Sequence, residues 1–292
     1  MGLISVTKCH GTGNDFIILN AREAADLPYA AIARTLCERR FGIGADGLLV
    51  LGKPQMSGMD ASMRIFNADG SEAEMCGNGI RCIARYLYEE NSERTEARIE
   101  TLAGVIETKI VTWDGAVGVQ VAMGEPKFKG GLPGKLGRSL AHNGESVAAH
   151  AVSMGNSHIV LFTTRDPAVY DLEDVAREVA MWSVFDSQPN VELAQLVRDG
   201  IRMRVYERGV GETWACGTGA CAVAVAAIAT GQMTSPVTVA TKGGLVRVDW
   251  QGSGNPARLT GNAELVFRTE FDAPSDAETI HIGLDRVDNP SP

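Results

Sequence analysis

The sequence lacks an apolar run long enough to cross a membrane. Its longest uninterrupted apolar stretch, Cys221–Ala229, is far shorter than the roughly 20 residues that a spanning helix needs. The first residues, 1–8, also lack the basic start and apolar run of a signal peptide. Both absences predict a cytoplasmic protein with no membrane partner.

Basic clusters are missing as well. The chain has 36 Asp and Glu against 27 Lys and Arg, a formal net charge of −9, and no Lys- or Arg-rich segment. Nonspecific nucleic-acid binding needs such a positive footprint, so we expect no nucleic-acid partner.

Spacings typical of metal ligands are absent too. The six cysteines form no Cys-x-x-Cys pair and the five histidines form no paired ligand motif, so we expect no metal. In a cytoplasmic chain the cysteines are expected to be reduced. Four of them, Cys9, Cys37, Cys82 and Cys221, are set among apolar residues and are interpreted as small core side chains.

What the sequence does contain is a repeat. Residues 63–84 (MRIFNADGSEAEMCGNGIRCIA) align with residues 203–224 (MRVYERGVGETWACGTGACAVA) at a constant offset of 140 residues. The aligned pairs include Met63 and Met203, Arg64 and Arg204, Glu72 and Glu212, Cys76 and Cys216, and Gly79 and Gly219. The blocks 99–105 and 239–245 keep this offset, and 13–19 resembles 155–161 at an offset of 142 residues. A register held over three separated blocks favours a duplicated half-molecule over chance.

The repeat and the composition together predict two domains. With 292 residues, 45% hydrophobic and 22% charged, the chain has the make-up of a globular protein of one large or two medium domains. We assign 1–130 to an N-terminal domain and 145–262 to a C-terminal domain. The Gly-rich segment 130–144 is the expected connection, and 273–292 is a polar tail.

Hydrophobic patterns give a coarse plan of the elements. In the first half they predict strands at 3–6, 16–19, 48–51, 63–66, 98–111 and 116–123, a loop at 9–15, and helices at 30–40 and 80–89. In the second half they predict a helix at 220–229 that is apolar all round, so sheet should surround it. Residues 42–47 match the dinucleotide-binding pattern G-x-G-x-x-G, but they follow a helix and open a strand, which predicts a simple turn.

Each half places one cysteine at the head of a predicted helix. The amides and dipole of a helix N-terminus favour the thiolate, and cysteines there have pKa values of roughly 3.5–7.5 instead of about 8.5. The backbone at Gly77-Asn78 and at Gly217-Thr218 would form two anion sites able to hold one carboxylate between them. The carbon next to that carboxylate would then lie between Cys76 and Cys216. This arrangement predicts racemisation or epimerisation of an amino acid without a cofactor.

Several motifs together resemble the diaminopimelate epimerase family, from residue 3 to about residue 270. They are Lys8-Cys-His-Gly-Thr-Gly-Asn-Asp-Phe16, Arg64-Ile-Phe-Asn-Ala-Asp-Gly70, Cys76-Gly-Asn-Gly79, Met154-Gly-Asn-Ser-His158, Arg204-Val-Tyr-Glu-Arg-Gly209 and Ala215-Cys-Gly-Thr-Gly-Ala220. The resemblance implies an α+β fold of two pseudo-symmetric domains, each a mixed or antiparallel sheet curled around a central helix. The C-terminal strand, near 263–272, would return to the first domain.

The resemblance also implies an activity. It is the interconversion of LL- and meso-2,6-diaminopimelate by two bases without pyridoxal phosphate, on the route to lysine and peptidoglycan, in a homodimer. Cys76 and Cys216 would be the acid and base, with Cys216 removing the proton of the LL isomer. Substrate-binding residues implied by the family, together with the two anion sites, are Asn14, Asn67, Gly77, Asn78, Asn156, Asn190, Glu207, Arg208, Gly217 and Thr218. His158 and Glu207 would tune the thiols.

Simpler structural roles are open for some of these residues. Asn67 and Asn190 fit turns, Asn14 and Asn156 fit loop caps, and Glu207-Arg208 fits a solvated ion pair. We expect Glu72 and Glu212, four residues before each cysteine, to be structural. One departure from the family is Gly47, which stands where many members have a glutamine that can contact substrate.

Two other functions fit part of the pattern. A proline or hydroxyproline racemase would use the same pair of cysteines, but Asn78 stands where that family usually has histidine, and Arg208 provides for a second carboxylate. A redox-sensing or ligand-binding protein would instead use the two cysteines as a switchable disulfide.

Overall fold

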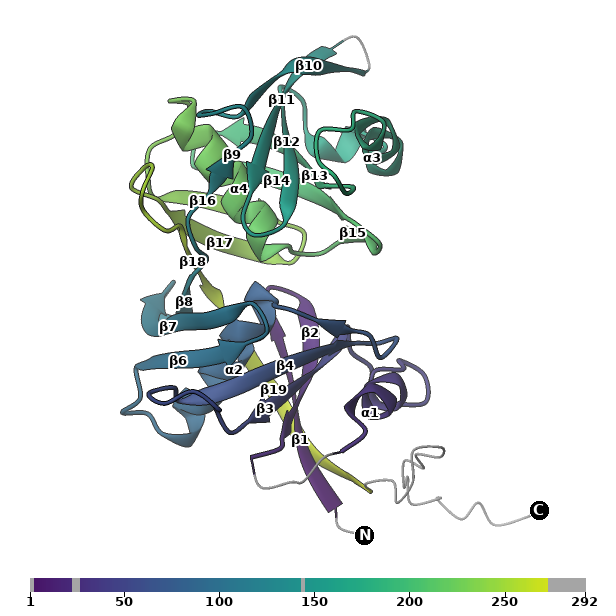
Figure 1. Cartoon of the computed structure of the whole chain (residues 1–292), viewed down its shortest axis with the longest axis vertical. Coiled ribbons are helices and arrows are strands. Elements are labelled where there is room, and N and C mark those ends of the chain that lie inside the picture. The colour runs from purple at the N-terminus through teal and green to yellow at the C-terminus, as the bar shows by residue number, and fades with distance from the viewer. Residues whose placement is uncertain (1–2, 23–26, 143–144, 273–292) are drawn as a thin grey trace, which may run out of the picture.

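Two lobes stacked along the long axis make up the computed structural model of the chain (Figure 1). The structure describes residues 3–22, 27–142 and 145–272, so the tail predicted at 273–292 lies outside the described residues. Strands dominate both lobes, and one helix runs through the middle of each, α2 in the first and α4 in the second. The predicted α+β class, with a sheet curled around a central helix in each half, is confirmed.

The first lobe is one curled sheet with two helices. Its elements are β1 (Leu3–Gly11), β2 (Asn14–Asn20), α1 (Tyr29–Leu36), β3 (Gly47–Gly52), β4 (Ala61–Asn67), β5 (Glu72–Ala73), α2 (Gly77–Glu90), β6 (Glu96–Thr101), β7 (Gly104–Trp113) and β8 (Ala116–Ala122). The strands pair in the order β1, β2, β3, β4, β6, β7, β8, with β5 added to β4. Only β2–β3 and β4–β6 are parallel. Helix α2 packs inside this curl, whereas α1 covers β3 and β4 from outside.

The second lobe repeats this plan strand for strand. Its elements are β11 (Glu145–Ser153), β12 (Ser157–Thr163), the short 3₁₀ helix η1 (Pro167–Val169), α3 (Leu172–Ala180), β13 (Asn190–Val197), β14 (Gly200–Glu207), β15 (Gly211–Thr213), α4 (Gly217–Ala229), β16 (Val237–Thr241), β17 (Gly244–Asp249) and β18 (Arg258–Asn262). The pairing order is β11, β12, β13, β14, β16, β17, β18, again with only the pairs β12–β13 and β14–β16 parallel. Ala61 lies opposite Ile99 and Ile201 opposite Val239, so even the register keeps the sequence offset. The duplication is therefore structural as well as sequential.

The two lobes exchange their last strands. β8 pairs with β18 between the lobes, β9 (Lys127–Phe128) pairs with β11 of the second lobe, and β19 (Glu264–Asp272) pairs with β1 of the first. The chain thus crosses from the first lobe to the second between β8 and β9. The connection predicted at 130–144 is wrong, because β10 (Lys135–His142) is a strand on β11. Domain boundaries beyond these pairings stay a prediction.

The loop predicted at 9–15 is also wrong. β1 runs to Gly11 and β2 begins at Asn14, so only Thr12 and Gly13 turn the chain. Both have positive φ, 55° and 78°, a conformation that glycine adopts freely and threonine rarely does. The strand predicted at 98–111 is likewise two strands, β6 and β7, joined by a tight turn.

A matched ion pair braces the turn before each central helix. Arg64 on β4 holds Glu72 on β5 through two hydrogen bonds of 2.6 and 2.9 Å. Arg204 holds Glu212 in the same way at 2.7 and 2.9 Å. The structural role predicted for the two glutamates is confirmed.

Helix α4 shows how completely the second sheet surrounds its centre. Residues Gly219–Ala227 are all buried, and strands from β11 to β18 contact the helix. This confirms that a helix without a polar face is enclosed. In the described part of the chain, no helix combines the length and apolarity needed to span a bilayer.

Candidate active site

The N-termini of the two central helices meet at the boundary between the lobes. Cys76 is the N-cap of α2 and Cys216 the N-cap of α4, each with extended backbone. A Cβ atom built on Gly77 would lie 3.9 Å from the Cα of Gly217, so the backbones there are nearly in contact. Because a glycine follows each cysteine, the two helix ends can approach this closely.

Both cysteines line one cavity of about 1160 Å³. Ten of the residues predicted for catalysis and binding contribute to its wall: Asn14, Cys76, Gly77, Asn78, Asn156, Glu207, Arg208, Cys216, Gly217 and Thr218. They come from opposite lobes and from segments far apart in the sequence. The structure therefore brings together most of the predicted set.

Three predicted residues lie outside the lining. In the turn after β4, Asn67 donates from Nδ2 to Ser71 Oγ at 2.9 Å. Asn190 accepts a 2.9 Å hydrogen bond from the Arg208 backbone and so shapes the turn after β14. His158 is fully buried behind Asn156. Direct contact of Asn67 or Asn190 with a substrate stays a prediction.

Asparagines surround Cys76. Its Sγ lies 3.8 Å from Asn14 Oδ1, and Asn78 donates to that same oxygen at 3.0 Å. Asn78 also donates to the carbonyl oxygen of Ala215 at 3.0 Å. Since Ala215 directly precedes Cys216, this one amide ties the two cysteine segments together across the lobe boundary.

A chain of polar groups leads away from Cys216. Thr218 Oγ1 lies 3.4 Å from Cys216 Sγ and accepts from Asn156 Nδ2 at 3.2 Å. Asn156 Oδ1 lies 2.9 Å from Nε2 of His158, and Nδ1 of His158 lies 2.7 Å from Glu192 Oε1. Glu192 is fully buried. The sequence reasoning missed it, although a glutamate between the apolar residues of β13 was the available signal.

The ionisation of the thiols differs from the expectation. Burial raises the pKa of the Cys76 thiol to about 11, more than the backbone amides of Gly79 and Asn78 lower it. Burial also raises the pKa of Cys216, and the carboxylates of Glu207 and Glu192 raise it further, against the hydrogen bond from Thr218. The predicted depression of both pKa values is therefore wrong, because desolvation outweighs the helix N-terminus.

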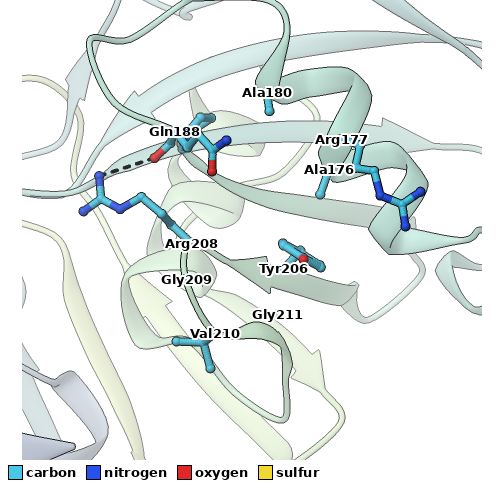
Figure 2. Close-up of a pocket in the computed structure, with 10 residues that line it drawn as sticks. Ala176, Arg177, Ala180, Gln188, Tyr206, Arg208, Gly209, Val210 and Gly211 are labelled. Carbon is cyan, nitrogen blue, oxygen red and sulfur yellow. Dashed lines mark hydrogen bonds between the residues drawn. The ribbon is translucent and has the colours of Figure 1, made fainter. Parts of the chain in front are cut away.

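Arg208 lies where the cysteine cavity meets a second one. Its Nη1 donates to Ser187 Oγ at 2.7 Å and lies 3.4 Å from the carbonyl oxygen of Gln188. Figure 2 shows the second cavity, of about 560 Å³, which Arg208 lines together with Tyr206 on β14 and Arg177 on α3. That cavity contains neither cysteine, whereas Arg208 lines both.

Met123 is a lining residue that the sequence did not single out. It follows β8, where the chain leaves the first lobe, and it is 5% exposed. A Cβ on Gly77 would meet its methyl group at 3.1 Å, and one on Gly217 would meet it at 3.8 Å. Met123 therefore packs against both helix ends. No local pattern marks this position, because its role depends on the strand exchange.

The remaining cysteines are core residues. Cys9, Cys37, Cys82 and Cys221 are buried and free, which confirms their predicted role. Across the described ranges, no cluster of three or more His, Cys, Asp or Glu side chains is arranged as metal ligands.

Comparison with known proteins identifies the family. The model of the family described as diaminopimelate epimerase matches residues 6–129 and 150–266, most of both lobes. The chain belongs to the diaminopimelate epimerase family. A diaminopimelate epimerase of Moorella thermoacetica is 44% identical over 278 residues, 90% of this chain and 98% of that protein. One of Synechocystis is 42% identical over 276 residues, covering 90% and 97%. The predicted family and enzyme class, an isomerase, are confirmed.

Solved structures place the diaminopimelate epimerase fold in a wider group. A phenazine biosynthesis protein of the PhzF family from Bacillus anthracis has a TM-score of 0.68 at 17% identity, covering 92% of this chain and 99% of its own. A hydroxyproline epimerase from Agrobacterium vitis has a TM-score of 0.65 at 16% identity, covering 93% and 92%. At such identities the likeness is one of fold alone. The proline racemase alternative is therefore supported only by a shared fold and not by the sequence.

Proposed function

We propose that this enzyme interconverts LL- and meso-2,6-diaminopimelate without a cofactor, in the synthesis of lysine and peptidoglycan precursors. One observation carries the proposal. Cys76 and Cys216 cap two helices whose first residues are nearly in contact, and both line the same cavity. A substrate carbon held there has one sulfur on each side.

The reaction needs only these two sulfurs to move protons. The thiolate of one cysteine takes the α-hydrogen as a proton and becomes a thiol. The thiol of the other gives its proton to the opposite face and becomes a thiolate. Family resemblance assigns the first step on the LL isomer to Cys216 and on the meso isomer to Cys76. Each turnover leaves the proton on the other sulfur, ready for the reverse direction.

The helix ends would stabilise the charge that develops. Backbone amides after Cys76 and Cys216 point at the place where the substrate carboxylate would lie. As the α-proton leaves, negative charge spreads onto that carboxylate, and fixed dipoles in a dry site stabilise it strongly. Proton transfer alone accounts for only ~10²–10⁴-fold.

Substrate binding would also help one thiol to ionise. Burial raises the pKa of both thiols, so their neutral forms prevail near pH 7. The α-ammonium group of a bound amino acid places a positive charge beside the sulfurs, and an opposite charge within about 4–6 Å favours the thiolate. The base would thus become active mainly in the complex.

The remaining polar residues of the cavity lining suit the second amino-acid end of diaminopimelate. Arg208 offers a planar fork of donors that suits a second carboxylate, while Glu207 can pair with an ammonium group. Asn14 and Asn156, at equivalent places in the two lobes, would hold the reacting amino group. Family resemblance further suggests a cytoplasmic homodimer, which size-exclusion chromatography and cell fractionation would test.

Deuterium incorporation tests this function directly. Reduced enzyme and LL-diaminopimelate in D₂O, with no cofactor added, should give the meso isomer carrying deuterium at the α-carbon. Cys76→Ala and Cys216→Ala should each lower epimerisation by ~10²–10⁴-fold. Cys37→Ala, a buried cysteine outside the cavity, should not. Absence of exchange under reducing conditions would reject the proposal and favour a binding or redox-switch protein.

A further inference from the structure

Arg81 is a fully buried cation that the proposed mechanism does not yet use. It lies on α2, five residues after Cys76, with 0% exposure. Its Nη2 donates to Thr12 Oγ1 at 2.7 Å and its Nε to the Asn262 carbonyl at 3.1 Å. Its Nη1 lies 3.5 Å from the Gly77 carbonyl. All three acceptors are neutral, and within the described residues no carboxylate lies at ion-pair distance from it.

The fold makes room for this side chain. A Cβ on Gly11 would lie 3.2 Å from Arg81 Nη2, and one on Gly261 would lie 3.4 Å from Nε. Neither glycine has positive φ, so space and not backbone conformation explains them. Two lobes contribute to the enclosure, because Gly11 ends β1 and Gly261 lies on β18.

Such a position is costly. An unpaired buried charge is unfavourable, and a cation in the first two turns of a helix also opposes the helix dipole. Cys221, at the same position of the repeat, is a small neutral side chain. Folding alone therefore does not require a charge at this position. A buried charge is normally paired, and one that is left unpaired points to a functional role.

The anion that would balance this charge is the thiolate of Cys76. The other thiols near Arg81 stay neutral, since burial raises the pKa of Cys221 to about 12 and that of Cys82 well above its ordinary value. Glu207, from β14, is the acidic group facing Cys76 and disfavours its ionisation. Arg81 is the cation that acts on it from α2.

We infer that Arg81 is a positioning residue whose buried charge favours the ionised form of Cys76 and whose hydrogen bonds fix the turn next to Asn14. The inference rests on the proposed acid–base role of Cys76. Its effect is selective: the positive charge of Arg81 lowers the pKa of Cys76, whereas the pKa of Cys216 is raised first by burial and then by the carboxylates of Glu207 and Glu192, with no such cation among the described groups that shift it most.

Alkylation of the two cysteines in the full enzyme tests this without measuring turnover. Neutral iodoacetamide is added at pH 8.5, and the rates for Cys76 and Cys216 are read from their separate peptides by mass spectrometry. Arg81→Gln keeps a hydrogen-bond donor but loses the charge, and should slow alkylation of Cys76 by about tenfold, one pKa unit, with Cys216 changed less than about twofold. Arg81→Lys should restore the Cys76 rate. Arg85→Met, which removes an exposed cation of the same helix, is the matched control and should leave both rates unchanged.

The outcomes separate cleanly. Selective slowing of Cys76 in Arg81→Gln, with rescue by lysine, supports the inference even if diaminopimelate is not the substrate. Equal slowing of both thiols, or an unchanged Cys76 rate in a folded variant, overturns it. Should Arg81→Gln fail to fold, the parent enzyme decides: Cys76 must become reactive at lower pH than Cys216, and the reverse order contradicts the inference.

Discussion

The surroundings of Cys76 and Cys216, the proposed catalytic pair, have the same frame but different charges. A Cβ on Gly79 would meet Leu49 at 2.9 Å, and one on Gly219 would meet Glu192 at 2.8 Å, so Leu49 and Glu192 are equivalent. By the offset of 142 residues, His158 corresponds to Phe16. Behind Cys76 these two positions are apolar, whereas behind Cys216 they form a buried acid–imidazole pair.

The asymmetry extends to the helices themselves. Arg81 on α2 is replaced by Cys221 on α4, so the first thiol has a buried cation near it and the second has a buried carboxylate. A two-base reaction requires one thiolate and one thiol at every stage, and identical environments would leave the choice open. We expect the unequal charges to make Cys76 the more readily ionised of the two thiols once substrate is bound, which favours the isomer that Cys76 is proposed to deprotonate.

The largest effect should come from breaking the buried pair of the second lobe. In His158→Phe, the residue found at the equivalent position of the first lobe, Glu192 loses its partner. Its Oε2 already has none in the described structure, so an unpaired buried carboxylate remains. Removing one member of a buried ion pair costs about 3–5 kcal/mol, and chemical denaturation should show a loss of that size.

A second substitution provides the control. Adding Glu192→Leu completes the apolar arrangement of the first lobe, and replacing a whole buried pair with apolar side chains is often neutral. Most of the lost stability should return. If His158→Phe alone unfolds at the same denaturant concentration as the parent, the pair does not behave as a buried charge site and the contrast between the lobes fails.

Glu207 raises the pKa of both thiols, whereas Arg81 and Glu192 are each expected to act mainly on one. Its carboxylate raises the pKa of Cys76 and of Cys216, and burial raises its own pKa. In Glu207→Gln this negative charge is gone at every pH, so both thiols should ionise more readily. Alkylation at pH 8.5 should accelerate by about tenfold at each cysteine, for a change of about one pKa unit.

The control for this variant is Glu96→Gln. Glu96 lies on β6, exposed and outside the cavity, and pairs with Lys109. It should change neither rate. Acceleration at only one cysteine would show that Glu207 acts on one thiol alone. Glu207 would then be a third charge, after Arg81 and Glu192, that distinguishes the two cysteines.

The repeat made much of this site predictable. Two copies of one unit related by a pseudo-twofold axis bring equivalent positions together, so a constant offset sufficed to predict that Cys76 and Cys216 would face one cavity. The glycines after them predicted backbone anion sites at both helix ends, but not that the two helix ends would lie nearly in contact. The structural role of Glu72 and Glu212 followed from the same register, although their arginine partners were not predicted.

What could not be predicted depends on contacts between the halves. The Gly-rich segment 130–144 has the composition of a linker, yet β10 within it forms a hairpin with β11, and the crossing between the lobes comes earlier, between β8 and β9. Arg81 looks like an ordinary polar position of a helix until the other elements bury it, and Glu192 differs from its neighbours only by standing among apolar residues of a strand. The pKa values were mispredicted for the same reason, since a helix N-terminus is visible in sequence and the desolvation of Cys76 is not.

The smallest effect should come from Thr218, whose hydroxyl replaces the amide of Asn78 in the first lobe. Its Oγ1 lies 3.4 Å from Cys216 Sγ, and this hydrogen bond lowers the pKa of that thiol. Thr218→Val keeps the shape and removes the hydroxyl, so the thiolate is less stable. A net loss of about 0.5–1 kcal/mol would slow alkylation of Cys216 by about two- to fivefold, with Cys76 unaffected. Thr218→Ser retains the hydroxyl and should match the parent. If serine and valine slow Cys216 equally, the methyl group and not the hydrogen bond is responsible, and the two sites differ in charge alone.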